Sequence, residues 1–250
     1  MKGQGSVLTI GGFDPVGHTG VSADRSALLA LGYKPVNAIS GVFISDGEIE
    51  PVDALILEHQ LKAFGDFNRI QGVKTGLLAT RENIEATATY FEDNKAQLHN
   101  LVVDVYLETE DESALLSSTA ISLLKMRLLP LATLAIAYLS EAERLAGQPV
   151  GGIDQMKEAA EAVRMYGPKL VLIKADHPVD EEMVDILYDG TEHQFLFTKN
   201  GKPAPPRQRR DVLASAVAAS LCKGYRVKEA VEAAKQFALA THPIGQAEPA

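Results

Sequence analysis

The sequence predicts an α/β protein whose mostly parallel sheet is covered by helices on both faces. Strand-like and helix-like segments alternate along almost the whole chain, which is typical of βαβ units. The predicted strands are continuous apolar runs, as expected for strands that are buried on both faces. The chain opens with a strand, a glycine loop and a helix over 7–31, and open parallel sheets place their ligands at such loops.

Each element follows from its local pattern. The apolar run Val7–Ile10 predicts the first strand, and helical periodicity predicts a helix over 21–31 after a loop with glycines at 11, 12, 17 and 20. The remaining predicted elements are a strand at 35–43, an amphipathic helix at 54–67, a strand at 72–77, a helix at 81–93, a strand at 101–105, an apolar-periodic stretch at 114–128, a strand at 133–137, a short helix from Ser140, a helix at 154–165, a strand at 170–173, a hairpin of 184–188 and 194–197 around Asp189-Gly190, and helices at 212–223 and 227–240.

Length and composition restrict the class of protein. No linker divides the 250 residues, so we predict one domain over 1–250, with a flexible tail at about 243–250. A net charge of -9 argues against nucleic acid as a partner. The single cysteine, Cys222, suits a reducing compartment and a packed core position. No apolar run reaches the roughly 18 residues of a membrane span. We expect no signal peptide before the first strand, and we predict a cytoplasmic protein without membrane contact.

The glycine loop supplies the first candidate site residues. Its glycines, Gly12 among them, would let the backbone approach a ligand closely, and Asp14 and Asp24 supply carboxylates. Asp24 is predicted to contact a ligand. The alternative is a first-turn carboxylate that interacts with the helix macrodipole.

The order of motifs resembles one family nearly end to end. The chain is similar to the hydroxymethylpyrimidine and phosphomethylpyrimidine kinases of thiamin biosynthesis, in the ribokinase-like group. This resemblance implies a three-layer α/β/α sandwich, a homodimer, a small-molecule ligand, and ATP with Mg²⁺ as cofactors. The segments that carry it are GGFDPVGHTGVSADRSALLALG, VKTGLL, LLPLATLAIAYLSEAERLAG, VLIKADH, VDILYDG and VLASAVAASLCKGYRVKEAVEAAKQF.

Departures from the family pattern gather at its reaction centre. The family's phosphate-binding G-T-G-C turn corresponds to Gln208, Arg209, Arg210 and Asp211. Arginines at this turn remove the backbone freedom of an anion-binding nest, although their side chains could hold phosphate. Elsewhere, Ser45 replaces the glutamine that reads the pyrimidine edge, Tyr138 replaces an asparagine while Glu141 remains, Val105 follows Asp104 in place of proline, and the K-G-G-H segment becomes Lys174, Ala175, Asp176 and His177.

Several of these residues admit a structural interpretation beside the functional one. Asp211 could be a catalytic base or an N-cap of the following helix. The arginines at 207, 209 and 210 could be a solvated loop or a clamp for phosphate. Lys174, after an apolar strand, could face an anion or the solvent. Glu141 could be an ordinary charge in the first turn of a short helix.

Two hypotheses follow. In the first, the chain is a kinase that transfers the γ-phosphoryl group of ATP to a hydroxymethyl group. Asp211 is then the base, and Lys174 with Arg209 or Arg210 steadies the phosphoryl group. Asp104 and Glu141 lie near Mg²⁺, Lys174 also contacts ATP, and Gly12, Asp14, Asp24 and Ser45 line the acceptor pocket. In the second, the chain is a kinase-fold protein without turnover that acts as a ligand sensor or an assembly subunit.

Overall fold

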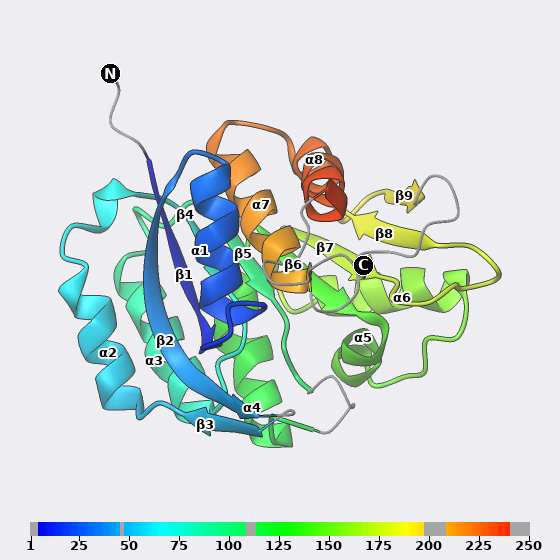
Figure 1. The fold of residues 1–250 in the computed structure, drawn as a ribbon. Coiled ribbons are helices and arrows are strands. Elements are labelled where there is room, and N and C mark those ends of the chain that lie inside the picture. Colours follow the sequence, from blue (N-terminus) through cyan, green and yellow to red (C-terminus); the bar gives the residue numbers. More distant parts are fainter. Residues whose placement is uncertain (1–4, 46–47, 109–113, 198–208, 241–250) are drawn as a thin grey trace, which may run out of the picture.

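The computed structural model describes residues 5–45, 48–108, 114–197 and 209–240 (Figure 1). Within these residues, nine strands form one sheet in the order β3-β2-β1-β4-β5-β6-β7-β8-β9. Pairing is parallel from β2 through β7, and antiparallel where β3, β8 and β9 extend the two edges. The predicted α/β class with a mostly parallel sheet is confirmed. The strands are β1 (Ser6–Phe13), β2 (Lys34–Ser45), β3 (Glu48–Pro51), β4 (Ile70–Thr75), β5 (Leu101–Asp104), β6 (Leu134–Tyr138), β7 (Leu170–Lys174), β8 (Val184–Tyr188) and β9 (His193–Phe197).

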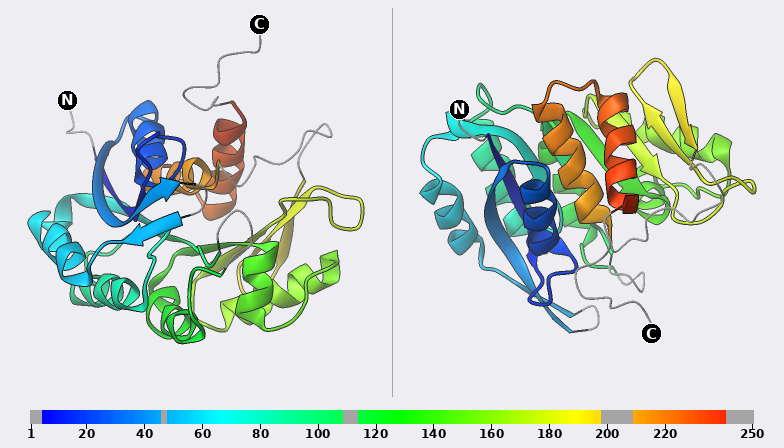
Figure 2. Two further views of the ribbon diagram at one scale, coloured as in Figure 1. Left: turned by 60° about the horizontal axis from the view of Figure 1, so that its bottom comes forward. Right: turned by 45° about the horizontal axis from the view of Figure 1, so that its top comes forward.

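Helices cover both faces of the sheet, so the molecule has three layers (Figure 2). Helices α1, α7 and α8 lie on one face, and α2 to α6 lie on the other. The bounds are α1 (Gly20–Ala30), α2 (Ala54–Ala63), α3 (Arg81–Asp93), α4 (Ser118–Leu123), α5 (Leu139–Ala146), α6 (Ile153–Arg164), α7 (Arg210–Cys222) and α8 (Val227–Ala240).

Two hydrophobic cores, one on each face, follow from alternation along the strands. In β1, Leu8 and Ile10 belong to the core under α2 and α3, whereas Val7 belongs to the core under α1 and α7. Neighbouring side chains of a strand point to opposite faces. Continuous apolar strands can therefore fill both cores, which is why the sequence predicted a doubly covered sheet.

Three details differ from the predictions. Strand β3 was not predicted, because EIEP reads as a polar segment and forms only a short, exposed edge. Helix α2 ends at Ala63 rather than at 67. In the stretch 114–128, α4 begins at Ser118 and continues as a π-helical turn over Leu124–Leu128. The predicted tail at about 243–250 lies outside the described residues.

The carboxyl ends of the parallel strands meet the first turns of α1 and α7. Helix α1 begins at Gly20 after β1, and α7 begins at Arg210 on the same face of the sheet. Most predicted site residues lie at this edge. In the described part of the chain, none of the helices combines the length and apolar character needed to cross a membrane.

Candidate functional site at the carboxyl ends of the strands

The loop between β1 and α1 is held in shape by its own residues. The Asp14 carboxylate accepts hydrogen bonds from three backbone N–H groups within 16–19, at 2.8 to 3.0 Å. Gly12 is buried, and a Cβ there would lie 2.5 Å from the Phe43 ring. Gly12 and Asp14 therefore shape the loop, and their place in an acceptor pocket stays a prediction.

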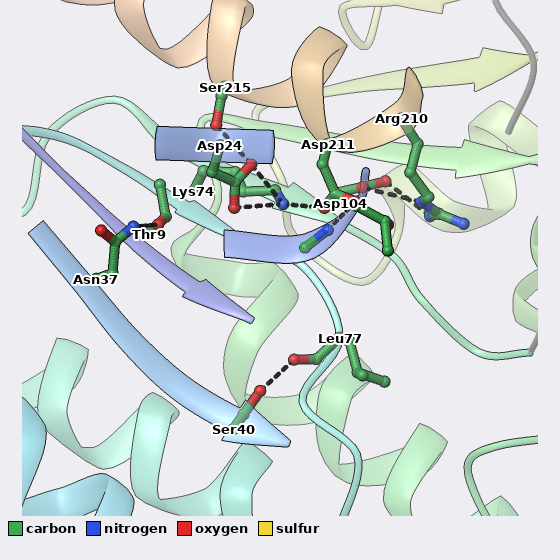
Figure 3. Close-up of polar contacts among 12 residues, drawn as sticks. Thr9, Asp24, Asn37, Ser40, Lys74, Leu77, Asp104, Arg210, Asp211 and Ser215 are labelled. Atoms are coloured by element: carbon green, nitrogen blue, oxygen red, sulfur yellow. Dashed lines mark hydrogen bonds and ion pairs between the residues drawn. The ribbon is translucent and has the colours of Figure 1, made fainter. Parts of the chain in front are cut away.

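Lys74 is the centre of a buried charge network at the end of β4 (Figure 3). Its ammonium nitrogen lies 2.5 Å from Asp211 Oδ1 and 3.0 Å from Asp24 Oδ1. Ser215 of α7 donates a hydrogen bond to Asp24 Oδ1 at 2.7 Å. The network joins α1, β4 and α7. Asp24 lies beyond the first turn of α1, so the first-turn interpretation is wrong, while its contact with a ligand stays a prediction.

Asp211 caps a helix other than its own. Its Oδ2 accepts hydrogen bonds from the Thr19 hydroxyl and the Gly20 backbone N–H, both at 2.8 Å. These are the N-cap residue and the first residue of α1. Helix α7 has Arg209 at its N-cap, without a side-chain capping bond. Asp211 therefore ties the start of α7 to the start of α1.

Burial and charge shift the pKa values of the two carboxylates in opposite directions. Burial raises the pKa of Asp24 to about 7, and the Lys74 charge offsets this only in part. Burial also acts to raise the pKa of Asp211, but the charge of Lys74 and hydrogen bonds from Lys74, Gly20 and Thr19 lower it to about 2. Burial opposes the charged form of Lys74, yet both carboxylates raise its pKa. At neutral pH, Lys74 and Asp211 are charged and Asp24 titrates.

Arg210 forms a second buried network beside the first. Its Nε and Nη2 donate to the two oxygens of Asp104 at 3.0 and 2.7 Å. Its Nη1 donates to Glu141 Oε1 at 2.9 Å, and its Nη2 donates to Glu141 Oε2 at 3.2 Å. The guanidinium carbon lies 4.4 Å from the ring centre of Tyr106 and 4.8 Å from that of Tyr138. The solvated-loop alternative for Arg210 is wrong, because its side chain is only 3% exposed.

The residues at this position do not fit the expected Mg²⁺. Both oxygens of Asp104 and both oxygens of Glu141 accept hydrogen bonds from Arg210, and Glu141 Oε2 also accepts the Tyr138 backbone N–H at 2.9 Å. Over residues 5–45, 48–108, 114–197 and 209–240, no group of three or more His, Cys, Asp or Glu could hold a metal ion. In this conformation, the predicted metal ligands Asp104 and Glu141 bind an arginine instead.

The Arg209 side chain contacts the end of α8. Its Nη1 donates hydrogen bonds to the carbonyl oxygens of Ala238 and Leu239 at the end of α8, at 2.9 and 3.4 Å. A cation at a helix C-terminus is favourable, because the last carbonyls lack partners. Arg209 therefore fastens α8 to α7, and a role for it in binding phosphate stays a prediction. Arg207 and Gln208 lie outside the described residues, as does the side chain of Ser45 at the end of β2.

Lys174 is a buried ammonium at the end of β7. It is 0% exposed, and among the described residues its Nζ has no hydrogen-bond partner. Asp185 Oδ1 lies 3.8 Å away, while Asp185 Oδ2 lies 2.7 Å from Lys235 Nζ. Burial lowers the pKa of Lys174, and Asp185 partly opposes this. The surface alternative is therefore wrong, and the ammonium is suited to an anionic group.

Sequence reasoning missed several members of these networks. Lys74, Ser215, Asp185 and Lys235 were not selected as site residues, although each is buried. Each of the four is a polar residue within a largely apolar segment, and a buried charge requires a partner. That pattern was the available signal. This pattern does not predict which residue each of them pairs with.

Comparison with known proteins assigns the family. A family model described as phosphomethylpyrimidine kinase matches residues 14–244. A hydroxymethylpyrimidine/phosphomethylpyrimidine kinase of Streptomyces coelicolor is 35% identical over 237 residues, which are 92% of this chain and 86% of that protein.

Solved structures agree with this assignment. A phosphomethylpyrimidine kinase from Clostridium difficile 630 superposes with a TM-score of 0.81 at 27% identity, covering 94% of this chain and 98% of that chain. The pyridoxal kinase of Staphylococcus aureus, in complex with AMP-PCP and pyridoxal, gives a TM-score of 0.82 at 27% identity, covering 95% and 87%. The fold, the order of motifs and these similarities agree: the chain belongs to the phosphomethylpyrimidine kinase family.

Proposed function

We propose that this chain is an ATP-dependent kinase of thiamin metabolism that phosphorylates a hydroxymethyl group on a small heteroaromatic molecule. Its relatives are named for hydroxymethylpyrimidine, phosphomethylpyrimidine and pyridoxine, all small heteroaromatic molecules. The observation that carries the proposal is the position of Asp211. Its ionised carboxylate lies in the first turn of α7 and is held by Thr19, Gly20 and Lys74 at the carboxyl ends of the strands.

Asp211 is the proposed acceptor of the hydroxyl proton. A pKa of about 2 keeps it ionised at every physiological pH, but also makes it a weak base. Phosphoryl transfer passes through a loose transition state, so positioning and charge neutralisation contribute more than base strength. Thr19, Gly20 and Lys74 fix the carboxylate, which supplies the positioning.

Lys174 is the proposed cation for the transferring phosphoryl group. Its ammonium is buried and lacks a hydrogen-bond partner among the described residues, and an anionic phosphate oxygen would be an ideal acceptor. Asp185 and Lys235 lie beside it and share their own ion pair. Lys174 can therefore turn towards a ligand without leaving a carboxylate unpaired.

The test is turnover, measured as ADP release with ATP and Mg²⁺ in the presence of hydroxymethylpyrimidine, its monophosphate or pyridoxal. We expect Asp211→Asn and Lys174→Met each to lower kcat/KM by about 100-fold or more. Asp154→Asn, at a carboxylate that is 86% exposed on α6, should not change turnover. Melting curves of each variant separate lost chemistry from lost folding. Absence of ADP release by the folded wild-type protein with every acceptor would contradict the proposal.

A second candidate function is ligand binding without phosphoryl transfer, and Arg210 favours it. The side chains of Arg210, Asp104 and Glu141 are buried at the start of α7 and carry a net charge of -1 when ionised. This charge would repel the phosphates of ATP. On this alternative, hydroxymethylpyrimidine at about 100 times its dissociation constant should stabilise the protein by about 2.7 kcal/mol without any ADP release.

We propose that this enzyme is located in the cytoplasm. We propose that the chain forms a homodimer and that its partner is a small molecule rather than a nucleic acid, in keeping with a net charge of -9. Light scattering after gel filtration tests the dimer. A mass of one chain at micromolar concentration would contradict it.

A further inference from the structure

The surroundings of the Arg210 guanidinium resemble those of a bound metal ion. Five oxygens from Asp104, Glu141 and the Val105 carbonyl accept its N–H groups, at 2.6 to 3.2 Å. Carboxylate and carbonyl oxygens are the donor set preferred by hard divalent cations. In this chain the same donors surround an organic cation that belongs to α7. Figure 3 shows Arg210 with one of them, Asp104.

This guanidinium is not easily displaced. The exposed fractions of the Arg210, Asp104 and Glu141 side chains are 3%, 1% and 0%. Two bidentate contacts match the planar fork of an arginine, which stays protonated at all physiological pH values. The rings of Tyr106 and Tyr138 lie near the guanidinium carbon, and an aromatic ring can attract a cation.

Arginine and a divalent cation exclude each other at this position. A metal ion bound to the same carboxylates would lie within a few ångströms of the guanidinium, where two positive charges repel strongly in a buried environment. The carboxylate oxygens are also already engaged, so a metal ion would have to break the hydrogen bonds to Arg210.

We propose that the Arg210 side chain takes the place of a divalent cation between Asp104 and Glu141, so that the chain binds no Mg²⁺ there and gains a divalent-cation site when the guanidinium is removed. This inference does not rest on the proposed kinase activity. It is tested by metal binding and by stability. The inference can therefore be contradicted while turnover is observed, and it can hold when no turnover is observed.

The decisive variant is Arg210→Ala, which removes the guanidinium from between the two buried carboxylates. We expect Mn²⁺ or Mg²⁺ at saturation to raise the melting temperature of this variant by about 5 °C or more. The wild-type protein should show the same melting temperature in EDTA and in either metal. Mn²⁺ binding, followed by electron paramagnetic resonance, should be tight for the variant alone.

Two further variants control the experiment. Arg226→Ala removes a surface guanidinium that pairs with Glu229 at 2.7 Å, and it should gain no metal site. The triple variant Asp104→Asn/Glu141→Gln/Arg210→Ala lacks the carboxylates, so its melting temperature should not respond to metal.

Two outcomes with folded proteins would overturn the inference. One is a tight Mn²⁺ site in the wild-type protein that disappears in Glu141→Gln. The other is an Arg210→Ala protein that folds yet binds no divalent cation. If Arg210→Ala does not fold without metal, refolding with Mn²⁺ but not with EDTA supports the inference. Failure to refold in both, while the triple variant folds, counts against it.

Discussion

Asp24 shows how a single buried residue can make stability depend on pH. Its folded-state pKa of about 7 lies above the ordinary value of 3.8, mainly because of burial. Between these values the folded protein holds a proton that the unfolded chain releases. Stability therefore falls as pH rises from about 4 to about 7, by up to about 1.4 kcal/mol per pH unit.

Asp24→Asn removes this titration. We expect the unfolding free energy of the variant to fall less steeply than that of the wild-type protein between pH 5 and pH 7. Urea unfolding at pH 5, 6 and 7 measures the two slopes, with Asp154→Asn as a surface control. Parallel slopes for the wild-type and Asp24→Asn proteins would show that Asp24 does not titrate in this range.

At the residue scale, the sequence predicted where the charged residues of the site lie better than it predicted which residues they pair with. Asp24, Asp211 and Lys174 follow from motif positions, and all three lie at the carboxyl ends of the strands. The pairing of Asp211 with Lys74 could not be predicted, because 137 residues separate them. The roles of these residues in catalysis stay predictions.

At the element scale, the loop between β1 and α1 shows the structural role of its glycines. The sequence suggested that they let the backbone approach a ligand. In the structure, Gly20 lets the backbone approach itself: a Cβ at Gly20 would lie 2.0 Å from the Gly12 carbonyl oxygen. Gly20 also has a positive φ of 61° and donates its N–H to Asp211.

Gly20→Ala should therefore be costly. We expect it to lower the unfolding free energy by about 3 kcal/mol or more, because left-handed strain adds to a collision with backbone. Gly17→Ala is the matched control in the same loop. Gly17 has a φ of 91° and open space around it, so strain alone should cost about 1–2 kcal/mol. Equal losses in urea unfolding would show that the collision is relieved by loop movement.

Periodicity in the sequence predicted the positions of helices and strands, but it did not predict the edge strand β3. Thirteen residues of α3 were predicted at their observed bounds, Arg81–Asp93, because Thr80 caps the helix and an apolar face runs along it. Strand β3 escaped prediction because edge strands are short and carry charges, here Glu48 and Glu50. The strand order could not be read from the pattern either, since it depends on how the connections cross the sheet.

At the scale of the whole molecule, an element near the C-terminus packs against elements near the N-terminus. Helix α7 packs against α1, β1, β4 and β5, although it follows them by more than 100 residues. Leu213 of α7 belongs to the same core as Val7 of β1. Neither end of the chain can bury its apolar surface without the other, so the prediction of one domain becomes a prediction about cooperativity.

We predict that the chain unfolds in one cooperative transition. Far-ultraviolet circular dichroism follows all helices, and tyrosine fluorescence reports on tertiary packing, because the chain has seven tyrosines and no tryptophan. Both probes should give the same urea midpoint.

Leu213→Ala, at a side chain that is 1% exposed, should lower both midpoints together through a loss of about 2–5 kcal/mol. Leu55→Ala, at a side chain that is 64% exposed, should leave them unchanged. Separate midpoints for the two probes would mean that the sheet consists of two independent units, and Leu213→Ala would then show which unit depends on α7.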